Sequence, residues 1–423
     1  MTIPLCLYQS LMRIGTPLCG GLLSWRERKG KEETARMAER TGIASRPRPH
    51  GPLVWIHAAS VGEAQSAMIL LDKLPQDMNI LITSGTVNSA RFLDKRLPAR
   101  AIHHYIPLDV PHWVARFLDH WRPDLALWME SELWPNMLGA MRARKIPAIL
   151  VNARLSDASY QRWRMLPASA RRILSGFALV LAQTDDAALK YRTLGASPVH
   201  NTDNLKYSAA PLPVNEGDLA ALQNAVAGRL VWVYASTHEG EEALAARVHD
   251  ALKQRLPGLL TVIVPRHPER RGQIAHILPA DGTLFRGEDK KLPDTHTQIY
   301  VADTLGELGL FYTAAPVALI GRSFSDDGGG GHNPIEAAQF DCAVLTGPHY
   351  QHQRALFDKM RVQDAAIIVG DEAQLSQTLY GLLSDPAYLA RQQDKARRFA
   401  AAKEAVVDTV MDHLRPFLPT AAA

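Results

Sequence analysis

Glu63 is the first residue of this 423-residue chain whose type and position suggest chemistry. It ends the segment 60–63 (SVGE), which follows an apolar run typical of a buried strand and opens a helical pattern. Ser-x-x-Glu is a capping box, in which the glutamate accepts a hydrogen bond from a backbone N–H. A carboxylate at the end of a strand can also act as a general base if burial raises its pKa. The spacing leaves both roles open.

Two further carboxylates, Glu130 and Glu132, end the apolar segment 125–129 (LALWM) and precede residues 133–135 (LWP). Glu130 terminates a strand pattern, where a helix cap is not needed, so a surface role and a functional role are both open. Basic residues that an anionic substrate could use lie around this segment, although most are expected on solvated helix faces. They are Arg142, Arg144, Lys145, Arg154, Arg162, Arg164, Arg171 and Arg172.

Four strand-to-helix junctions in the second half of the chain carry polar or glycine-rich segments: 236–241 (STHEGE), 264–268 (VPRHP), 303–307 (DTLGE) and 328–336 (GGGGHNPIE). Arg266 can bind a phosphate, and the glycines permit close approach of the backbone. Pro334 suits the first position of a helix whose free N–H groups attract anions, while Glu336 can cap that helix or bind ribose hydroxyls. The segment matches neither the dinucleotide fingerprint nor the P-loop. Together the junctions predict a nucleotide site.

The elements that must position these residues follow a repeating pattern of apolar runs and amphipathic segments. The runs predicted as strands are 54–60, 79–85, 125–130, 148–153 and 179–183, then 230–236, 259–265, 298–302, 317–320, 343–345 and 366–369. The Pro-rich segment 205–216 interrupts the pattern and is predicted to be a linker. The alternation predicts two α/β domains with parallel sheets, in which ligands bind at the carboxyl ends of the strands.

Charge and composition exclude several classes of protein. The formal charge is only +4, which gives no reason to expect nucleic-acid binding. Three cysteines without metal-ligand spacing indicate neither a disulfide framework nor a zinc site. Residues 1–50 hold nine basic and four acidic side chains, a net charge of +5, so the basic excess is N-terminal.

The N-terminal segment 3–25 is mostly apolar and is followed by Arg26, Arg28, Lys29 and Lys31. As a helix it would be ~34 Å long, enough to span a bilayer core of ~30 Å. Interrupting glycines and a proline favour instead a helix that lies on the membrane surface, with an ordinary helix packed on its own domain as the alternative. The predicted organisation is therefore a membrane-associated segment (1–30), a first domain (31–204), the linker (205–216) and a second domain with a long C-terminal helix (217–423).

Seven motifs occur in order through nearly the whole chain: 59–63 (ASVGE), 129–136 (MESELWPN), 151–156 (VNARLS), 204–206 (NLK), 235–241 (ASTHEGE), 264–270 (VPRHPER) and 330–336 (GGHNPIE). They closely resemble the motifs of the bacterial lipid A Kdo (3-deoxy-D-manno-octulosonic acid) transferases. Four residues, in three segments, depart from the family's usual pattern. Ala38 stands where Gly usually precedes Glu-Arg, Asp203 where Gly usually precedes NLK, and Asp326 and Asp327 add acids before the glycine run.

The resemblance implies a GT-B architecture, in which the acceptor binds the N-terminal Rossmann-like domain and the donor CMP-Kdo binds the C-terminal one across a cleft. It implies that Glu63 is the proton acceptor and that Glu130 and Lys206 stabilise the transition state. The implied CMP contacts are Pro265, Arg266, Leu305, Gly306, Glu307, Asn333, Pro334, Ile335 and Glu336. No metal and no cofactor other than the nucleotide-sugar donor is expected.

The implied reaction is an inverting transfer of Kdo to the lipid A precursor, a tetraacyl disaccharide bisphosphate, in lipopolysaccharide core synthesis. The expected location is the cytoplasmic face of the bacterial inner membrane. Two alternatives stay open at this point: another GT-B nucleotide-sugar enzyme, which would not need the NLK and ELWP segments, and a non-catalytic lipid-binding protein, which would not need Glu63 or Arg266.

Overall fold

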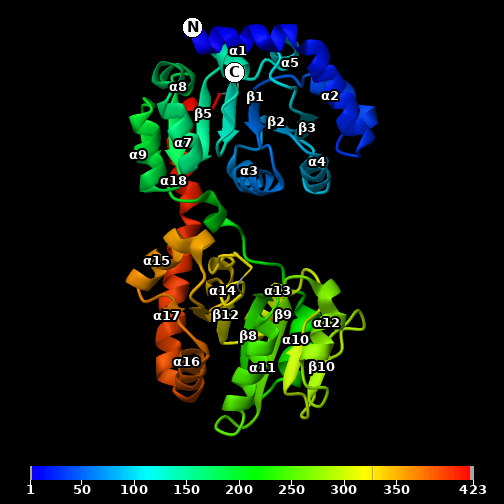
Figure 1. Ribbon diagram of the computed structural model, residues 1–423, viewed down its shortest axis with the longest axis vertical. Helices are drawn as coiled ribbons and strands as arrows, with labels where there is room; N and C mark the ends of the chain where they lie inside the picture. Colours follow the sequence, from blue (N-terminus) through cyan, green and yellow to red (C-terminus); the bar gives the residue numbers. More distant parts are fainter. Residues whose placement is uncertain (1, 326, 420–423) are drawn as a thin grey trace. The chain divides into compact units, whose positions relative to one another are not determined.

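The computed structural model describes residues 2–325 and 327–419, which form two compact units. Unit 1 comprises the chain up to Ala209 and the segment from Glu404 onward, and unit 2 runs from Ala210 to Lys403. Each unit contains, within the described residues, a seven-stranded sheet whose strands pair in parallel, with helices beside it (Figure 1). The predicted α/β class is therefore confirmed.

The sheet of unit 1 has the strand order β3-β2-β1-β4-β5-β6-β7. Its strands are β1 (Leu53–His57), β2 (Asn79–Ser84), β3 (Ala101–Tyr105), β4 (Leu125–Met129), β5 (Ala148–Ala153), β6 (Leu179–Ala182) and β7 (Val199–Asn201). The helices are α1 (Ile3–Ile14), α2 (Thr16–Arg28), α3 (Val61–Lys73), α4 (Val87–Asp94), α5 (Pro111–Trp121), α6 (Pro135–Ala143), α7 (Asp157–Arg164), α8 (Pro167–Leu174), α9 (Asp185–Thr193) and α18 (Val406–Leu414), with the 3-10 helices η1 (Thr34–Thr41), η2 (Leu205–Ser208) and η5 (Arg415–Phe417).

The sheet of unit 2 has the strand order β10-β11-β9-β8-β12-β13-β14. Its strands are β8 (Leu230–Thr237), β9 (Leu259–Pro265), β10 (Thr283–Phe285), β11 (Ile299–Val301), β12 (Val317–Ile320), β13 (Ala343–Thr346) and β14 (Ile367–Ile368). The helices are α10 (Glu216–Ala225), α11 (Glu241–Leu252), α12 (Arg271–Ile277), α13 (Leu308–Ala314), α14 (Ile335–Ala338), α15 (Arg354–Val362), α16 (Glu372–Ser384) and α17 (Pro386–Glu404), with η3 (Pro268–Arg270) and η4 (Gln351–Gln353).

The central strands β1 and β4 are buried along their whole length. Successive side chains point to opposite faces of a strand, so each face needs its own apolar cover. Trp55 packs with Phe117 of α5 on one face, at 5.0 Å between ring centroids, while Val54 belongs to the core under α3 on the other face. This double cover explains why both strands read as continuous apolar runs.

The C-terminal helix α18 belongs to unit 1, whereas the sequence pattern assigns all of residues 217–423 to the second domain. Its apolar residues Val407, Val410 and Leu414 join the core beneath α3, and the Val407 N–H donates to Ser208 Oγ at 3.0 Å. A helical period shows that a helix has an apolar face but not which sheet that face covers. The predicted linker also differs in part, because Leu205 at its start is fully buried in unit 1.

Three strands, β3, β7 and β10, are absent from the sequence prediction. Strands β7 and β10 are short and only partly buried, so neither forms a continuous apolar run in the sequence. Strand β3 (AIHHY) carries His103 and His104 where an apolar run is expected. Burial lowers the pKa of His103 to about 3 and that of His104 to about 4, so both are neutral at pH 7 and compatible with the core.

The N-terminal segment forms two helices, α1 and α2, that meet at Gly15. A proline follows as the second residue of α2, where its missing N–H costs no intrahelical hydrogen bond. Large apolar side chains remain exposed along both helices at positions 3, 7, 11, 14, 18, 22 and 25; Ile3, Ile14 and Leu18 are 85%, 79% and 79% exposed. We call these seven residues the apolar stripe. In the described part of the chain, no helix combines the length and apolar character needed to cross a bilayer.

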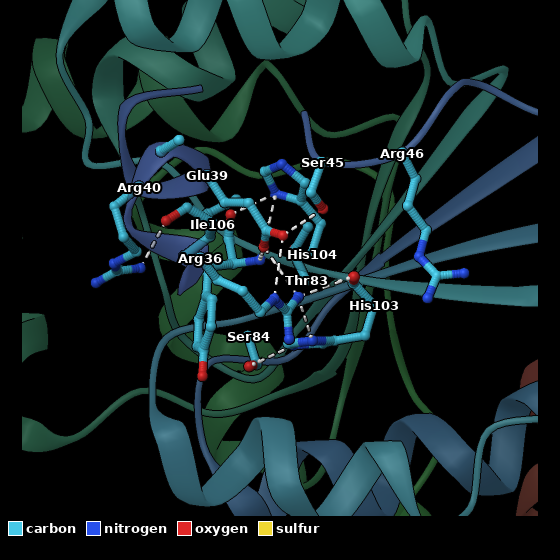
Figure 2. A network of polar contacts seen from close by, with 12 residues as sticks. Arg36, Glu39, Arg40, Ser45, Arg46, Thr83, Ser84, His103, His104 and Ile106 are labelled. Carbon is cyan, nitrogen blue, oxygen red and sulfur yellow. Dashed lines mark hydrogen bonds and ion pairs between the residues drawn. The ribbon is translucent and has the colours of Figure 1, made fainter. Parts of the chain in front are cut away.

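A buried polar network fastens η1 to the end of β3, and Figure 2 shows its members. The fully buried Glu39 accepts hydrogen bonds from Arg36 Nε and Nη2 at 3.0 and 2.9 Å, and from the Tyr105 N–H at 2.7 Å. Arg40 Nη1 donates to the Ile106 carbonyl at 2.6 Å. These residues explain the Ala-Glu-Arg segment as a structural motif, because both charged side chains hold the chain that leaves β3.

Glu39→Ala leaves the Arg36 guanidinium without its principal partner and the buried Tyr105 N–H without an acceptor. Its expected cost is about 3–5 kcal/mol in the free energy of unfolding. Urea unfolding followed by tryptophan fluorescence measures it, since seven of the eight tryptophans lie in unit 1. The control is Asp119→Ala, which breaks the exposed ion pair with Arg144 and should cost about 1 kcal/mol or less. Equal costs for the two variants would contradict a structural role of the network.

Candidate functional site

Glu63 lies in the first turn of α3, and the residue is 8% exposed. A cap forms with one difference from the standard capping box. Ser60 Oγ accepts from the Glu63 N–H at 3.3 Å, and the Glu63 carboxylate accepts from Ser60 Oγ at 3.0 Å and from the N–H of Ala59, the residue before the cap, at 2.8 Å. Burial, with a further contribution from the negative charge of Glu130, nevertheless raises the pKa of Glu63 to about 7. Glu63 is therefore a cap that can also accept a proton near neutral pH.

Glu130 follows β4 and is 3% exposed. Its carboxylate is held by two cations, Lys206 Nζ at 2.8 Å and Arg154 Nε at 2.9 Å. The backbone of Glu130 has φ +57°, in the left-handed region that residues other than glycine rarely adopt. This conformation costs free energy, so it depends on the contacts that hold Glu130 in place.

Lys206 is brought to Glu130 by η2. The Leu205 N–H donates to Oδ1 of the buried Asn152 at 2.9 Å, and Asn204 Oδ1 accepts from the Lys206 N–H at 3.1 Å. The Lys206 ammonium also lies over the start of α3, because a Cβ on Gly62 would be 3.4 Å from Nζ. The predicted residues Glu63, Glu130 and Lys206 thus lie in one cluster of unit 1.

Asp203 occupies the position where the family that the motifs resemble usually has glycine. Its φ is +66°, so the conformation that favours glycine is kept here by an aspartate. The Asp203 side chain accepts a hydrogen bond from the Asn204 N–H at 3.0 Å, which is the local contact that allows Asp in this region. Asp203 therefore adopts the left-handed backbone conformation that a glycine would allow at this position.

Asp109 is a site-supporting residue that the sequence does not reveal. Its buried carboxylate accepts from the Asn136 and Met137 N–H groups at 3.0 and 2.8 Å, and from Tyr8 Oη of α1 at 3.0 Å. Burial raises its pKa to about 6. Asp109 therefore caps α6 from a distance in sequence and ties α1 to the helix that follows Glu130. The sequence indicates only indirectly that α6 needs a cap from elsewhere: its N-cap residue is Trp134, whose side chain cannot cap the helix.

Glu132 is held within its own segment. Trp134 Nε1 donates to the Glu132 carboxylate, and Trp128 Nε1 donates to the Glu132 carbonyl. These two contacts fold the chain tightly between β4 and α6. Of the two carboxylates after β4, Glu130 is therefore the one that meets the cationic cluster, and Glu132 shapes the turn.

Unit 2 contains a pocket of about 530 Å³ at the carboxyl ends of its strands. The pocket is lined by six of the predicted residues, namely Pro265, Arg266, Leu305, Gly306, Asn333 and Glu336, and also by Arg322, His332 and His352, which were not predicted. Burial raises the pKa of Glu336, and Asn333 Nδ2 approaches its carboxylate at 3.5 Å. The pocket thus offers cationic groups for an anion and a carboxylate for hydroxyl groups.

Three predicted contacts, Glu307, Pro334 and Ile335, lie outside the described lining of this pocket. Glu307 accepts two hydrogen bonds from Arg286, both at 2.9 Å, and these contacts outweigh burial and lower its pKa to about 2. Its role here is to hold the loop after β11. The helix expected at Pro334 is α14, which has only four residues, so the predicted anion site at a helix start has little dipole behind it.

The glycine run has a packing function in this structure. A Cβ on Gly329 would be 1.8 Å from Arg322 Nε, and one on Gly330 would be 2.4 Å from the His352 N atom. The glycines therefore let the loop pass against Arg322 and η4. Of the two acids before the run, Asp326 lies outside the described residues, and Asp327 pairs with Arg322 at 3.2 Å.

His332, which lines the same pocket, contacts His238. The Nε2 atoms of His238 and His332 are 3.1 Å apart, and His238 Nδ1 is 3.3 Å from the Asp327 carboxylate. Burial, followed by the positive charges around it, lowers the pKa of His332 to about 4. Glu241, in the same motif as His238, accepts hydrogen bonds from the backbone N–H groups of residues 322–324 and so fixes the loop after β12.

In residues 2–325 and 327–419, no three His, Cys, Asp or Glu side chains are grouped so as to hold a metal ion.

Comparison with solved structures bears on the fold. The structure is similar to that of Anabaena Alr3699/HepE in complex with UDP, with a TM-score of 0.55, 14% sequence identity, and coverage of 86% of this chain and 100% of that one. At this identity the likeness is evidence of fold alone. With the two parallel sheets, it confirms the GT-B architecture of two Rossmann-like units.

Comparison with known sequences bears on the family. Residues 35–209 match the family described as 3-deoxy-D-manno-octulosonic-acid transferase (kdotransferase). The probable mitochondrial 3-deoxy-D-manno-octulosonic acid transferase of Arabidopsis thaliana is 36% identical over 401 residues, covering 92% of this chain and 90% of that protein. The 3-deoxy-D-manno-octulosonic acid transferase of Haemophilus influenzae is 32% identical over 425 residues, covering 97% and 98%. This chain belongs to the 3-deoxy-D-manno-octulosonic acid transferase family of glycosyltransferases.

Proposed function

We propose that this chain transfers Kdo from CMP-Kdo onto the lipid A precursor, a tetraacyl disaccharide bisphosphate, with inversion at the anomeric carbon. The observation that carries the proposal is the pair Glu63 and Glu130: one buried carboxylate with a pKa raised to about 7 beside another that holds Lys206 and Arg154. A base that titrates near neutral pH beside fixed cations suits transfer to a sugar hydroxyl.

In the proposed reaction, Glu63 accepts the proton of an acceptor hydroxyl. The hydroxyl oxygen forms a bond to the anomeric carbon of Kdo as the bond between that carbon and the CMP phosphate oxygen breaks. The bonding electrons leave with the phosphate of CMP, and the proton remains on Glu63. Attack opposite to the leaving group inverts the configuration at this carbon.

The role proposed for Glu130 is to position Lys206 and Arg154. Kdo carries its own carboxylate, so the sugar brings a negative charge to the reacting centre. A cation fixed in advance stabilises that charge without reorganisation during the reaction. With Nζ 2.8 Å from Glu130 and its ammonium over the start of α3, Lys206 is held within reach of the segment that carries Glu63.

Donor recognition is proposed for the pocket of unit 2. Arg266 and Arg322 supply guanidinium groups for the phosphate of CMP. Glu336, half-buried and with its pKa raised by desolvation, can bind ribose hydroxyls. Pro265, Leu305 and Gly306 complete the described lining near these residues.

The apolar stripe of α1 and α2 supports a proposed location on the cytoplasmic face of the inner membrane. Seven large apolar residues are exposed along the two helices, and Arg26, Arg28, Lys29 and Lys31 follow at the end of α2. Apolar side chains can enter the boundary of the acyl chains while basic side chains meet anionic headgroups. The acceptor is itself a membrane lipid, so this placement would bring the enzyme to its substrate.

Glu63→Gln tests the transfer chemistry. Glutamine can keep the cap, because its carbonyl oxygen accepts from the Ala59 N–H and its amide group donates to Ser60 Oγ, but it cannot accept the proton. Transfer should fall by ~10²–10⁴ with little change in melting temperature. Mass spectrometry of the lipid product after incubation with CMP-Kdo measures the transfer. The control Asp72→Asn removes an exposed charge from the same helix and should be active; a Glu63→Gln enzyme of similar activity would leave Glu63 as a cap only.

Arg266→Ala tests the donor site. Loss of a charge-assisted hydrogen bond of ~1.5–3 kcal/mol should weaken CMP binding by roughly tenfold to a hundredfold. Calorimetric titration with CMP measures this, with UDP as the second ligand to separate a CMP-Kdo enzyme from a UDP-sugar enzyme. Arg247→Ala is the control, because Arg247 forms an exposed ion pair with Glu372 on the surface of unit 2. Unchanged CMP affinity in Arg266→Ala, or tighter binding of UDP than of CMP, would contradict the assignment.

A further inference from the structure

A second pocket lies in unit 1, where α1 packs beside α5 and α6. Its volume is about 390 Å³, and much of its wall is apolar, formed by Leu5, Pro111, Leu138 and Ile173. We call it the α1 groove. Glu63, Glu130 and Lys206 are not among its described lining residues, so it is distinct from the site proposed for transfer.

Four arginines line the α1 groove: Arg13, Arg142, Arg144 and Arg172. Arg144 is paired with Asp119 at 2.7 Å. For the other three, no ion pair with an acidic side chain is found in residues 2–325 and 327–419. The groove therefore carries positive charge that is not neutralised by the described part of the protein.

Arg142 and Arg172 are close neighbours. Arg142 Nη1 donates to the Arg172 carbonyl at 3.3 Å and to Ser175 Oγ at 3.4 Å. Burial, followed by the charge of Arg172, lowers the pKa of Arg142. Two guanidinium groups placed together repel each other, and an anion between them would relieve that repulsion. Guanidinium groups are well suited to phosphate because two parallel N–H groups can meet two oxygens.

Helix α1 separates this groove from the apolar stripe. Leu5, Gln9 and Arg13, each four residues apart, line the groove, whereas Ile3, Leu7, Leu11 and Ile14 are exposed. Residues four apart share one face of a helix, so α1 presents one face to the groove and another to its surroundings. The groove and the apolar stripe therefore lie on different faces of the same helix.

We infer that the α1 groove binds the phosphate headgroup of an anionic phospholipid while the acyl chains stay in the bilayer against the apolar stripe. This inference goes beyond the transfer reaction and rests on the proposed membrane association. The volume of the groove suits a headgroup, since ligand pockets are usually about 300–1,000 Å³. The site holds α1 to the membrane by a specific contact, in addition to the general attraction of Arg26, Arg28, Lys29 and Lys31 to anionic headgroups.

Two variants of the full chain separate this site from diffuse charge attraction. Arg142→Lys with Arg172→Lys keeps both charges but removes the planar guanidinium groups. Gly139→Leu fills the groove, since a Cβ at Gly139 meets open space, and leaves every charge in place. The matched controls are Arg162→Lys with Arg164→Lys on α7, outside the described lining, and Gly272→Leu on α12 of unit 2, where a Cβ also meets open space.

The probe is flotation with vesicles of phosphatidylcholine, with and without phosphatidylglycerol. Both groove variants should bind the phosphatidylglycerol vesicles about tenfold more weakly than the wild type, while both controls bind normally. Leu7→Gln with Leu11→Gln should weaken binding to both kinds of vesicle. Melting temperatures should be unchanged in all variants, which separates loss of binding from loss of folding.

Groove variants that bind phosphatidylglycerol vesicles as well as the wild type would overturn the inference and leave only diffuse attraction. An equal loss on pure phosphatidylcholine would overturn it too, because the effect would then concern packing of α1. Release of the protein by millimolar inorganic phosphate at constant ionic strength would show a site for free phosphate instead. None of these measurements involves Kdo transfer, so failure of the proposed transfer reaction would produce none of these outcomes. Wild-type protein that binds neither kind of vesicle would instead overturn the proposed membrane association, and this inference with it.

Discussion

The structure of the proposed transfer site depends on the burial of one carboxylate, that of Glu130. A buried charge is stable only with close partners, and Glu130 obtains them from Arg154 after β5 and from Lys206 in η2. Lys206 is 76 residues from Glu130 in sequence, yet this contact fixes the ammonium over the start of α3. The charge of Glu130 also contributes to the raised pKa of Glu63. One carboxylate thus holds the Lys206 ammonium in place and contributes to the raised pKa of Glu63, the proposed base.

The sequence predicts the parts of this site that sit at the ends of strands. Parallel strands bring their carboxyl ends to one edge of a sheet, so Glu63 and Glu130 could be expected to lie close together. The partners supplied by other loops could not be predicted from the residues alone. Asn152, which anchors η2, and Asp109, which caps α6, act through long-range backbone contacts that leave no local pattern. The ion pair of Arg154 with Glu130 could not be predicted either, because Arg154 is one of eight basic residues that are expected mostly on helix faces.

The second unit shows the same limit. The predicted motifs do converge on one pocket, but several of their residues hold loops in place. Glu241 fixes the loop after β12, Glu307 is engaged by Arg286, and the glycine run makes room for Arg322. A sequence motif records that residue types occur together, and it does not separate side chains that meet a ligand from those that support them. Helix α18 is a similar case, because the spacing of its apolar residues predicts a helix but does not show which sheet the helix covers.

The most direct test of this account is the pH dependence of kcat/KM for Kdo transfer. Because burial and neighbouring carboxylates raise the pKa of Glu63 to about 7, the free enzyme should lose activity as pH falls through about 7, where the base becomes protonated. Glu132→Gln keeps an acceptor for Trp134 and removes one of the neighbouring negative charges, so it should move this limb to lower pH. The account would be contradicted if the wild-type enzyme lost activity only near pH 4.3, the pKa of an unperturbed glutamate, and if this loss occurred at the same pH in Glu132→Gln.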